Sequence, residues 1–321
     1  MLVANNLIRS ATRSKNDRLS CVAICRENES FLKLMSNLEC DFYVIRSPNV
    51  SDWKNSIQEK PRNVKVINDL TELMSKPIDF VLCNDRLQEF DLAYQISSVA
   101  HVPLLLIDHV SSGLRQKLPL FSSVGENAGL FHRPLDINVA TSDQVKTSWS
   151  SQMSSISICI PIFLEEECFE YDLSKKKGFL IDNNVPQDAI NFIAPVFRHA
   201  ECNLRYIDGQ VAKNPKDYIA YVNTWNNIDA KTLMAMSAGC ITISPKNQEI
   251  ENFITHGENG LLFENPPQLY ALVDECLNGK HDDLIENSIA TAKELTCSKE
   301  EFLKKWNQVL GYISNLFYIR K

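Results

Sequence analysis

The sequence predicts an α/β protein with two domains, each built on a parallel sheet. Short apolar runs typical of buried parallel strands alternate with helical patterns along most of the chain. The run VPLLLIDHV (102–110) is continuous in apolar character, as expected of a strand covered on both faces. A charge-dense stretch at 164–178 interrupts the series, and a second strand–helix series follows it.

The first series occupies the N-terminal half. We expect its strands at 19–25, 41–46, 79–84, 102–110, 136–142 and 155–163. Its helices are expected at 28–38, at 86–99 and after the strand at 136–142, where the helix runs through Trp149. The helix at 86–99 carries the apolar residues Leu87, Phe90, Leu92, Ala93 and Ile96 on one side, which predicts that this side is buried. Residues 111–135 contain glycines and prolines and read as irregular.

The stretch LEEECFEYDLSKKKG places the boundary between the domains. Its acidic residues followed by three lysines are typical of a solvated linker. We therefore assign 1–163 to the first domain, 164–177 to the linker and 178–321 to the second domain.

Residues 219–278 give the most detailed prediction. A strand at 219–225 leads through a polar turn into a helix of small and apolar residues that Gly239 closes, since glycine suits the left-handed position after a helix. A strand at Cys240–Ser244 stops at Pro245. A short helix, a turn at 257–260, a third strand and another helix complete the unit.

The chain ends in a predicted amphipathic helix. Ser298 with Glu301 three residues later forms a capping box. The helix carries Phe302, Trp306, Leu310, Ile313 and Phe317 at helical spacing, which predicts an apolar stripe that packs on a core.

Composition narrows the class of protein. The 321 residues are 44% hydrophobic, enough for large cores, and include no apolar run long enough to span a membrane and no signal peptide. The net charge of −7 argues against nucleic acid as the main partner. The ten cysteines show no disulfide or zinc spacing, so we expect reduced thiols and a cytoplasmic location.

The segments AMSAG and FITHGENGLLF, with the helix after them, resemble the nucleotide-sugar domain of GT-B glycosyltransferases of family 4. The stretch from Asp79 to His109 is similar to a strand–helix–strand of a compact, partly phage-encoded subset, in which the last strand ends in an acidic residue and a histidine, here Asp108 and His109. The resemblance implies two Rossmann-like domains that face a cleft, with the last helix crossing back to the first domain.

The resemblance also implies a function. Such enzymes transfer a sugar from a nucleotide-sugar donor to an acceptor with retention, and need no cofactor beyond the donor. The donor's diphosphate is expected at the start of the helix that opens near residue 230, because a helix N-terminus offers free N–H groups to phosphate. The residues at that place are Asn226, Asn227, Asp229, Ala230, Lys231 and Thr232. The alternative is that Asp229 only caps the helix and Lys231 is solvated.

Other candidate site residues lie in loops after strands. His109 is the candidate catalytic residue, for contact with the donor sugar or for proton transfer. Arg26, Glu27 and Asn28 replace the glycines that many such enzymes carry after the first strand, and suit a polar acceptor such as a glycan or a small molecule. No metal site is expected, because no Asp-x-Asp occurs at a strand end.

Several family positions are changed in this chain. Gln187 stands where the family has an arginine, and Asn226 and Met234 stand where it has two glutamates. In the later motif, Asn252 takes the place of another glutamate. These changes favour a weak enzyme, or alternatively a non-catalytic GT-B protein that binds a sugar, a nucleotide or a partner. A third alternative is a phage-type enzyme that glycosylates modified DNA bases, which the negative charge disfavours.

Overall fold

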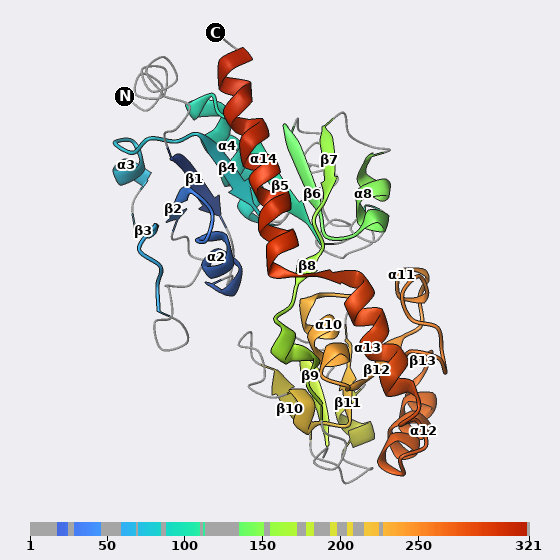
Figure 1. Ribbon diagram of the computed structural model, residues 1–321. Coiled ribbons are helices and arrows are strands. Elements are labelled where there is room, and N and C mark those ends of the chain that lie inside the picture. The colour runs from blue at the N-terminus through green and yellow to red at the C-terminus, as the bar shows by residue number, and fades with distance from the viewer. Residues whose placement is uncertain are drawn as a thin grey trace. The chain divides into compact units, whose positions relative to one another are not determined.

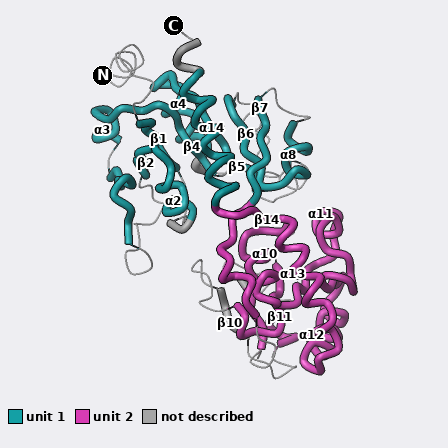
Figure 2. The backbone as a smooth tube through the Cα atoms, in the orientation of Figure 1, with its two compact units in different colours: residues 1–161, 300–321 teal, residues 162–299 magenta. Residues whose placement is uncertain are grey.

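The computed structural model divides the chain into two compact units (Figure 2). Unit 1 comprises residues 1–161 and 300–321, and unit 2 comprises residues 162–299. The structure describes residues 18–24, 29–45, 59–68, 70–84, 88–109, 112, 135–150, 155–171, 178–182, 193–197, 204–207, 215–224 and 227–319. The chain passes from one unit to the other at 161–162 and again at 299–300.

Unit 1 is built on a parallel sheet with the strand order β3-β2-β1-β4-β5-β6-β7 (Figure 1). Its strands are β1 (Leu19–Ile24), β2 (Cys40–Ile45), β3 (Val64–Ile67), β4 (Phe80–Cys83), β5 (Leu104–Asp108), β6 (Ile137–Ala140) and β7 (Ile156–Cys159). Its helices are α2 (Glu29–Met35), α3 (Leu70–Leu73), α4 (Gln88–Ala100), α8 (Asp143–Ser150) and α14 (Lys299–Ile319). The order reverses direction between β1 and β4, as in doubly wound folds.

The apolar runs of the sequence form the core of this sheet. Every residue of β1, β4 and β5 is buried, which explains why these strands read as continuous apolar runs. Helix α4 covers them with Phe90, Ala93 and Ile96. Two carboxylates accept hydrogen bonds from backbone N–H groups near the starts of strands. Asp79 accepts from the N–H of Ser20 at 2.7 Å, and Asp136 accepts from the N–H of Leu104 at 2.9 Å.

Helix α14 packs on unit 1 through aromatic side chains. The ring of Phe31, in α2, lies 6.4 Å from the ring of Phe302 and 6.1 Å from that of Trp306, centroid to centroid. Both contacts are edge-on, a favourable arrangement for aromatic rings. Ile313, two turns beyond Trp306, is fully buried as well. The part of the predicted stripe from Phe302 to Ile313 is therefore buried, and it belongs to unit 1, whereas the side chain of Phe317 lies outside the described residues.

Unit 2 holds a second parallel sheet, with the strand order β10-β9-β11-β12-β13. Its strands are β9 (Phe179–Asp182), β10 (Leu204–Ile207), β11 (Ala220–Val222), β12 (Ile241–Pro245) and β13 (Leu261–Phe263). Its helices are α10 (Ala230–Ser237), α11 (Gln248–Glu251), α12 (Pro266–Leu277) and α13 (Leu284–Leu295), with single turns of 3-10 helix at Glu166–Phe169 and Pro215–Asp217. A short parallel pair joins β8 (Ile162–Phe163) and β14 (Thr296–Cys297).

The helices of unit 2 cover both faces of its sheet. Ile181 packs with residues of α12 and α13, whereas its neighbour Leu180 packs with Ala235 of α10. Successive side chains of a strand point to opposite faces, so α10 lies on one face and α12 on the other. The turn into β12 uses Gly239 at φ +75°, the left-handed conformation predicted from the sequence.

Three short strands were missed, and one predicted strand is divided. No clear sequence signal marks β3 or β10, which have four residues each, or β14, which has two. The run at 155–163 forms β7 and β8 rather than one strand, and β8 belongs to unit 2.

Eight cysteines lie in the part of the chain that the structure describes, and all eight are free thiols. Burial raises the pKa of Cys40 well above its usual value and that of Cys276 to about 12, so these thiols stay protonated at neutral pH. Among the helices described, none combines the length and the apolar character needed to cross a membrane.

Candidate functional site

The strand order of unit 2 points to one place for a ligand. The order β10-β9-β11-β12-β13 changes direction between β9 and β11, and ligands of open α/β sheets bind beyond the carboxyl ends of the strands at such a point. β11 ends at Val222, and the loop after it leads directly into α10 at Ala230. The start of α10 is therefore the part of the described chain that lies at this position.

Asp229 shapes the start of α10. Its backbone is extended, and its Oδ1 atom accepts hydrogen bonds from the N–H and from the hydroxyl of Thr232, both at 2.8 Å. This is an N-cap, which satisfies one of the first-turn N–H groups that a helix cannot bond internally. Asp229 therefore caps the helix, as the alternative interpretation proposed, and its carboxylate places negative charge at the site.

A buried asparagine holds the loop before α10. Asn223 follows β11, is fully buried, and donates from Nδ2 to the backbone oxygen of Asn227 at 3.0 Å. Its own N–H donates to the backbone oxygen of Ile243 in β12 at 2.9 Å. The sequence analysis missed Asn223. The sequence feature that could have identified Asn223 is its place as a polar residue directly after an apolar strand, where a buried side chain can fix a loop.

The first turn of α10 presents different groups to solvent. Ala230 is exposed and Lys231 is half-buried, whereas Thr232 is fully buried. Because the hydroxyl of Thr232 donates to Asp229 inside the protein, it supports the cap instead of facing an open site. Lys231 is the one cation in the turn.

Met234 faces an apolar cluster. Its half-buried side chain packs with Leu164, Leu233 and Phe169, among others. The side chain of Met234 thus serves packing. Asn252 is exposed and donates from Nδ2 to the backbone oxygen of Gln248 at 2.7 Å, which ends α11.

The remaining candidates lie elsewhere. His109 follows β5 in unit 1 and is half-buried, next to the buried Asp108. The candidates Arg26, Glu27, Asn28, Gln187 and Asn226 fall outside the described residues. No group of three or more His, Cys, Asp or Glu side chains suited to a metal ion occurs in the described part of the chain.

His256 has a structural role. Its Nδ1 atom accepts a hydrogen bond from the N–H of Leu262 at 2.9 Å. The turn beside it is fixed by Asn259, whose side chain bonds the backbone of Thr255 and Phe253.

Comparisons with known proteins place the fold. No family model matches the sequence, and no curated protein matches it significantly. The structure is similar to that of HepE from Anabaena, solved in complex with UDP and glucose, with a TM-score of 0.68, 10% identity and coverage of 92% of this chain and 100% of HepE.

Two other solved structures are also similar in fold to this chain. A sucrose-phosphate synthase from Thermosynechococcus elongatus has a TM-score of 0.62 at 11% identity, with 91% of this chain and 98% of that chain covered. The lipopolysaccharide outer core galactosyltransferase WaaB has a TM-score of 0.51 at 14% identity, with 91% and 99% covered. The chain has the α/β fold of GT-B glycosyltransferases, as predicted.

Proposed function

We propose that this protein is a glycosyltransferase that takes a sugar from a nucleotide-sugar donor and passes it to a polar acceptor, with retention at the anomeric carbon. The observation that carries the proposal is the start of α10 at the direction change of the unit 2 sheet, with Lys231 in its first turn. Support comes from HepE, a structure of the same fold that has been solved with UDP-glucose at 11% identity.

The proposed chemistry uses few charged groups. When the bond between the sugar and the diphosphate breaks, negative charge develops on the departing oxygen. The N-terminal end of α10 and Lys231 are proposed to stabilise that charge. For unit 1, the proposal assigns proton transfer or a contact with the donor sugar to His109. Arg26, Glu27 and Asn28 are proposed acceptor contacts, and no metal or other cofactor takes part.

The further assignments belong to the same proposal. Membership of family 4 is proposed on the segments AMSAG and FITHGENGLLF, and membership of its compact, phage-like subset on the stretch from Asp79 to His109. A cytoplasmic location is proposed on the free thiols of the described cysteines. Nucleic acid is not proposed as a substrate, because the net charge is −7.

A non-catalytic GT-B protein is the second candidate, and two observations favour it. The carboxylate of Asp229 occupies the helix start where a diphosphate would bind, and like charges repel. Met234 packs in an apolar cluster where the family has a glutamate. Both observations predict weak donor binding. Because a weak enzyme would also bind its donor weakly, a measurement of turnover is needed to separate the two candidates.

The test uses UDP and UDP-glucose as probes in calorimetric titrations. Lys231→Ala should weaken UDP binding by about 3- to 10-fold, equal to about 0.7–1.4 kcal/mol. Asp229→Asn should strengthen it, because the amide oxygen can still cap the helix while the charge is removed. Lys304→Ala, an exposed lysine of α14, is the control for loss of one positive charge.

The outcomes separate the two candidates. Equal UDP affinity in the Lys231→Ala variant would place the nucleotide elsewhere. Binding of UDP-glucose without release of glucose or transfer to any acceptor would favour the non-catalytic protein. Glucose release that depends on Lys231 would support the enzyme.

A further inference from the structure

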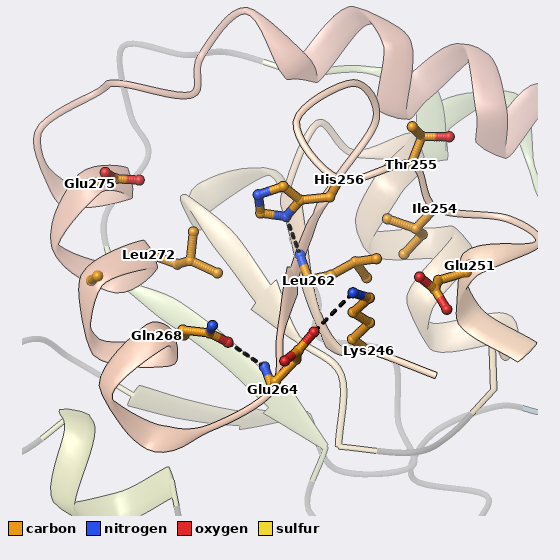
Figure 3. Close-up of a pocket in the computed structure, with 11 residues that line it drawn as sticks. Lys246, Glu251, Ile254, Thr255, His256, Leu262, Glu264, Gln268, Leu272 and Glu275 are labelled. Atoms are coloured by element: carbon orange, nitrogen blue, oxygen red, sulfur yellow. Dashed lines mark hydrogen bonds and ion pairs between the residues drawn. The ribbon is translucent and has the colours of Figure 1, made fainter. Parts of the chain in front are cut away.

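A pocket of about 590 Å³ lies in unit 2 along the outer side of β13, between α11 and α12 (Figure 3). β13 is the last strand of its sheet, so one side of its backbone pairs with no other strand among the described residues. The volume is within the range of about 300–1,000 Å³ that is usual for small-molecule sites. Among the described residues, none that lines the pocket belongs to α10 or to the loop before it, so this pocket is separate from the proposed nucleotide site.

The floor of the pocket is apolar. Ile254, Leu262 and Leu272 line it, and each of the three is more than nine-tenths buried. Ala271, an exposed residue of α12, completes the apolar part of the lining. A ligand with a face of C–H groups would remove further apolar surface from water here.

Two side chains provide hydrogen-bond donors in fixed positions. The N–H of Leu262 donates to Nδ1 of His256 at 2.9 Å, and the N–H of Glu264 donates to Oε1 of Gln268 at 2.7 Å. These bonds use the acceptor atom of each side chain. The proton of the neutral imidazole is then on Nε2, and the amide of Gln268 keeps its NH₂ group. In Figure 3 that NH₂ group turns toward the pocket.

The charges that line the pocket are largely compensated. Lys246 pairs with Glu264 at 2.8 Å, and this bond raises the pKa of Lys246 and lowers that of Glu264. Glu275 is bonded to Lys280 and to His281. Both bonds lower the pKa of its carboxyl group, and the bond to Lys280 has the larger effect.

The sign of the remaining charge excludes strongly charged ligands. A phosphate would approach the carboxylates of Glu251, Glu264 and Glu275, which repel it. A cation would compete with the lysines that already hold Glu264 and Glu275. An uncharged ligand meets neither cost, and the carboxylate oxygens remain available to accept hydrogen bonds from its hydroxyl groups.

We propose that this pocket binds an uncharged, polyhydroxylated ligand, the chemistry of a saccharide unit. A sugar ring presents a C–H face for the apolar floor, and hydroxyl groups that both donate and accept around its rim. The NH₂ group of Gln268 and the Nε2–H group of His256 donate to those hydroxyls, and Glu251 accepts from them. The inference holds whether or not the start of α10 binds a nucleotide.

The test is saturation-transfer NMR on the full chain with three neutral probes, maltotriose, cellotriose and chitotriose. Each is used at about 10 mM, a concentration that detects millimolar binding. At least one probe should receive saturation in the presence of excess UDP, and glucose 6-phosphate should receive less.

Variants assign the signal to the pocket. Ala271→Trp fills the pocket from an exposed position of α12 and should abolish the signal, whereas Leu277→Trp, exposed on the same helix outside the pocket, should leave it. Gln268→Glu keeps an acceptor for the N–H of Glu264 but loses the NH₂ donor, and should weaken binding by about fivefold or more. UDP affinity should stay the same in all three variants.

Two results would overturn the proposal. One is the absence of saturation transfer to all three probes with the unmodified protein. The other is a signal that survives in the Ala271→Trp variant, which would locate saccharide binding elsewhere. Failure of UDP to bind would count against the proposed function alone, because the sugar measurement uses no nucleotide chemistry.

Discussion

Truncation of Asp229 to alanine should destabilise α10 by more than an ordinary helix cap is worth. Asp229 accepts two hydrogen bonds from Thr232, one from the N–H and one from the hydroxyl. Loss of an N-cap costs about 1 kcal/mol. The hydroxyl of Thr232 would in addition be left without its partner in a fully buried residue, which costs about 1–3 kcal/mol. The total is therefore about 2–4 kcal/mol.

A second substitution isolates the hydroxyl. Thr232→Val removes it with little change of shape, so Asp229→Ala in that background should cost only the cap, about 1 kcal/mol. The difference between the two backgrounds, about 1–3 kcal/mol, is the coupling between carboxylate and hydroxyl. Asn265→Ala is the matched control, because Asn265 caps α12 through the N–H of Gln268 in an exposed setting.

The assay is amide hydrogen exchange of α10 followed by mass spectrometry, which gives the free energy of local opening. It reports on the helix itself and does not depend on how the two units unfold. Equal costs of Asp229→Ala in the two backgrounds would refute the reasoning, because the hydrogen bond between the buried hydroxyl and the carboxylate would then contribute nothing to stability. A cost below about 0.5 kcal/mol in the original background would refute the cap as well.

Two further predictions concern packing. Gly260→Ala should lower the free energy of unfolding by about 1–3 kcal/mol, because a Cβ atom there would lie 2.9 Å from Cγ2 of Ile254. Gly311→Ala, within α14 where a Cβ atom meets nothing within 4 Å, should instead raise it by about 0.5–1 kcal/mol; urea unfolding distinguishes the signs. Met234→Glu should destabilise α10 by about 1–3 kcal/mol, measured by hydrogen exchange, since it puts a charge into an apolar cluster, whereas Met234→Leu should be nearly neutral. A Met234→Glu variant as stable as the unmodified protein would contradict the packing assigned to this side chain.

The sequence by itself determined features that depend on local chemistry. Continuous apolar runs predicted β1, β4 and β5, because a strand covered on both faces needs apolar residues at every position. Gly239 predicted the end of the helix before β12, because only glycine adopts a left-handed conformation at no steric cost. The cap at Asp229 was readable in the same way, as a short acceptor side chain before a helix.

The tertiary structure decided which way side chains point. Met234 and Lys231 lie in the same helix, and sequence spacing alone did not show that Met234 meets an apolar cluster. The hydroxyl of Thr232 could be assigned to a ligand until the fold buried it beside Asp229. Such outcomes depend on packing between segments distant in the chain, such as Phe169 against α10, and no local pattern encodes them.

The same reason explains the pocket beside β13. His256 and Gln268 stand on either side of this strand in the sequence. His256 accepts from the N–H of Leu262 in the strand, and Gln268 accepts from the N–H of Glu264, directly after it. Which side of β13 lacks a neighbour follows from the strand order of the sheet, a property of the whole of unit 2. The residues were therefore visible in the sequence, while their common position became defined only when the sheet assembled.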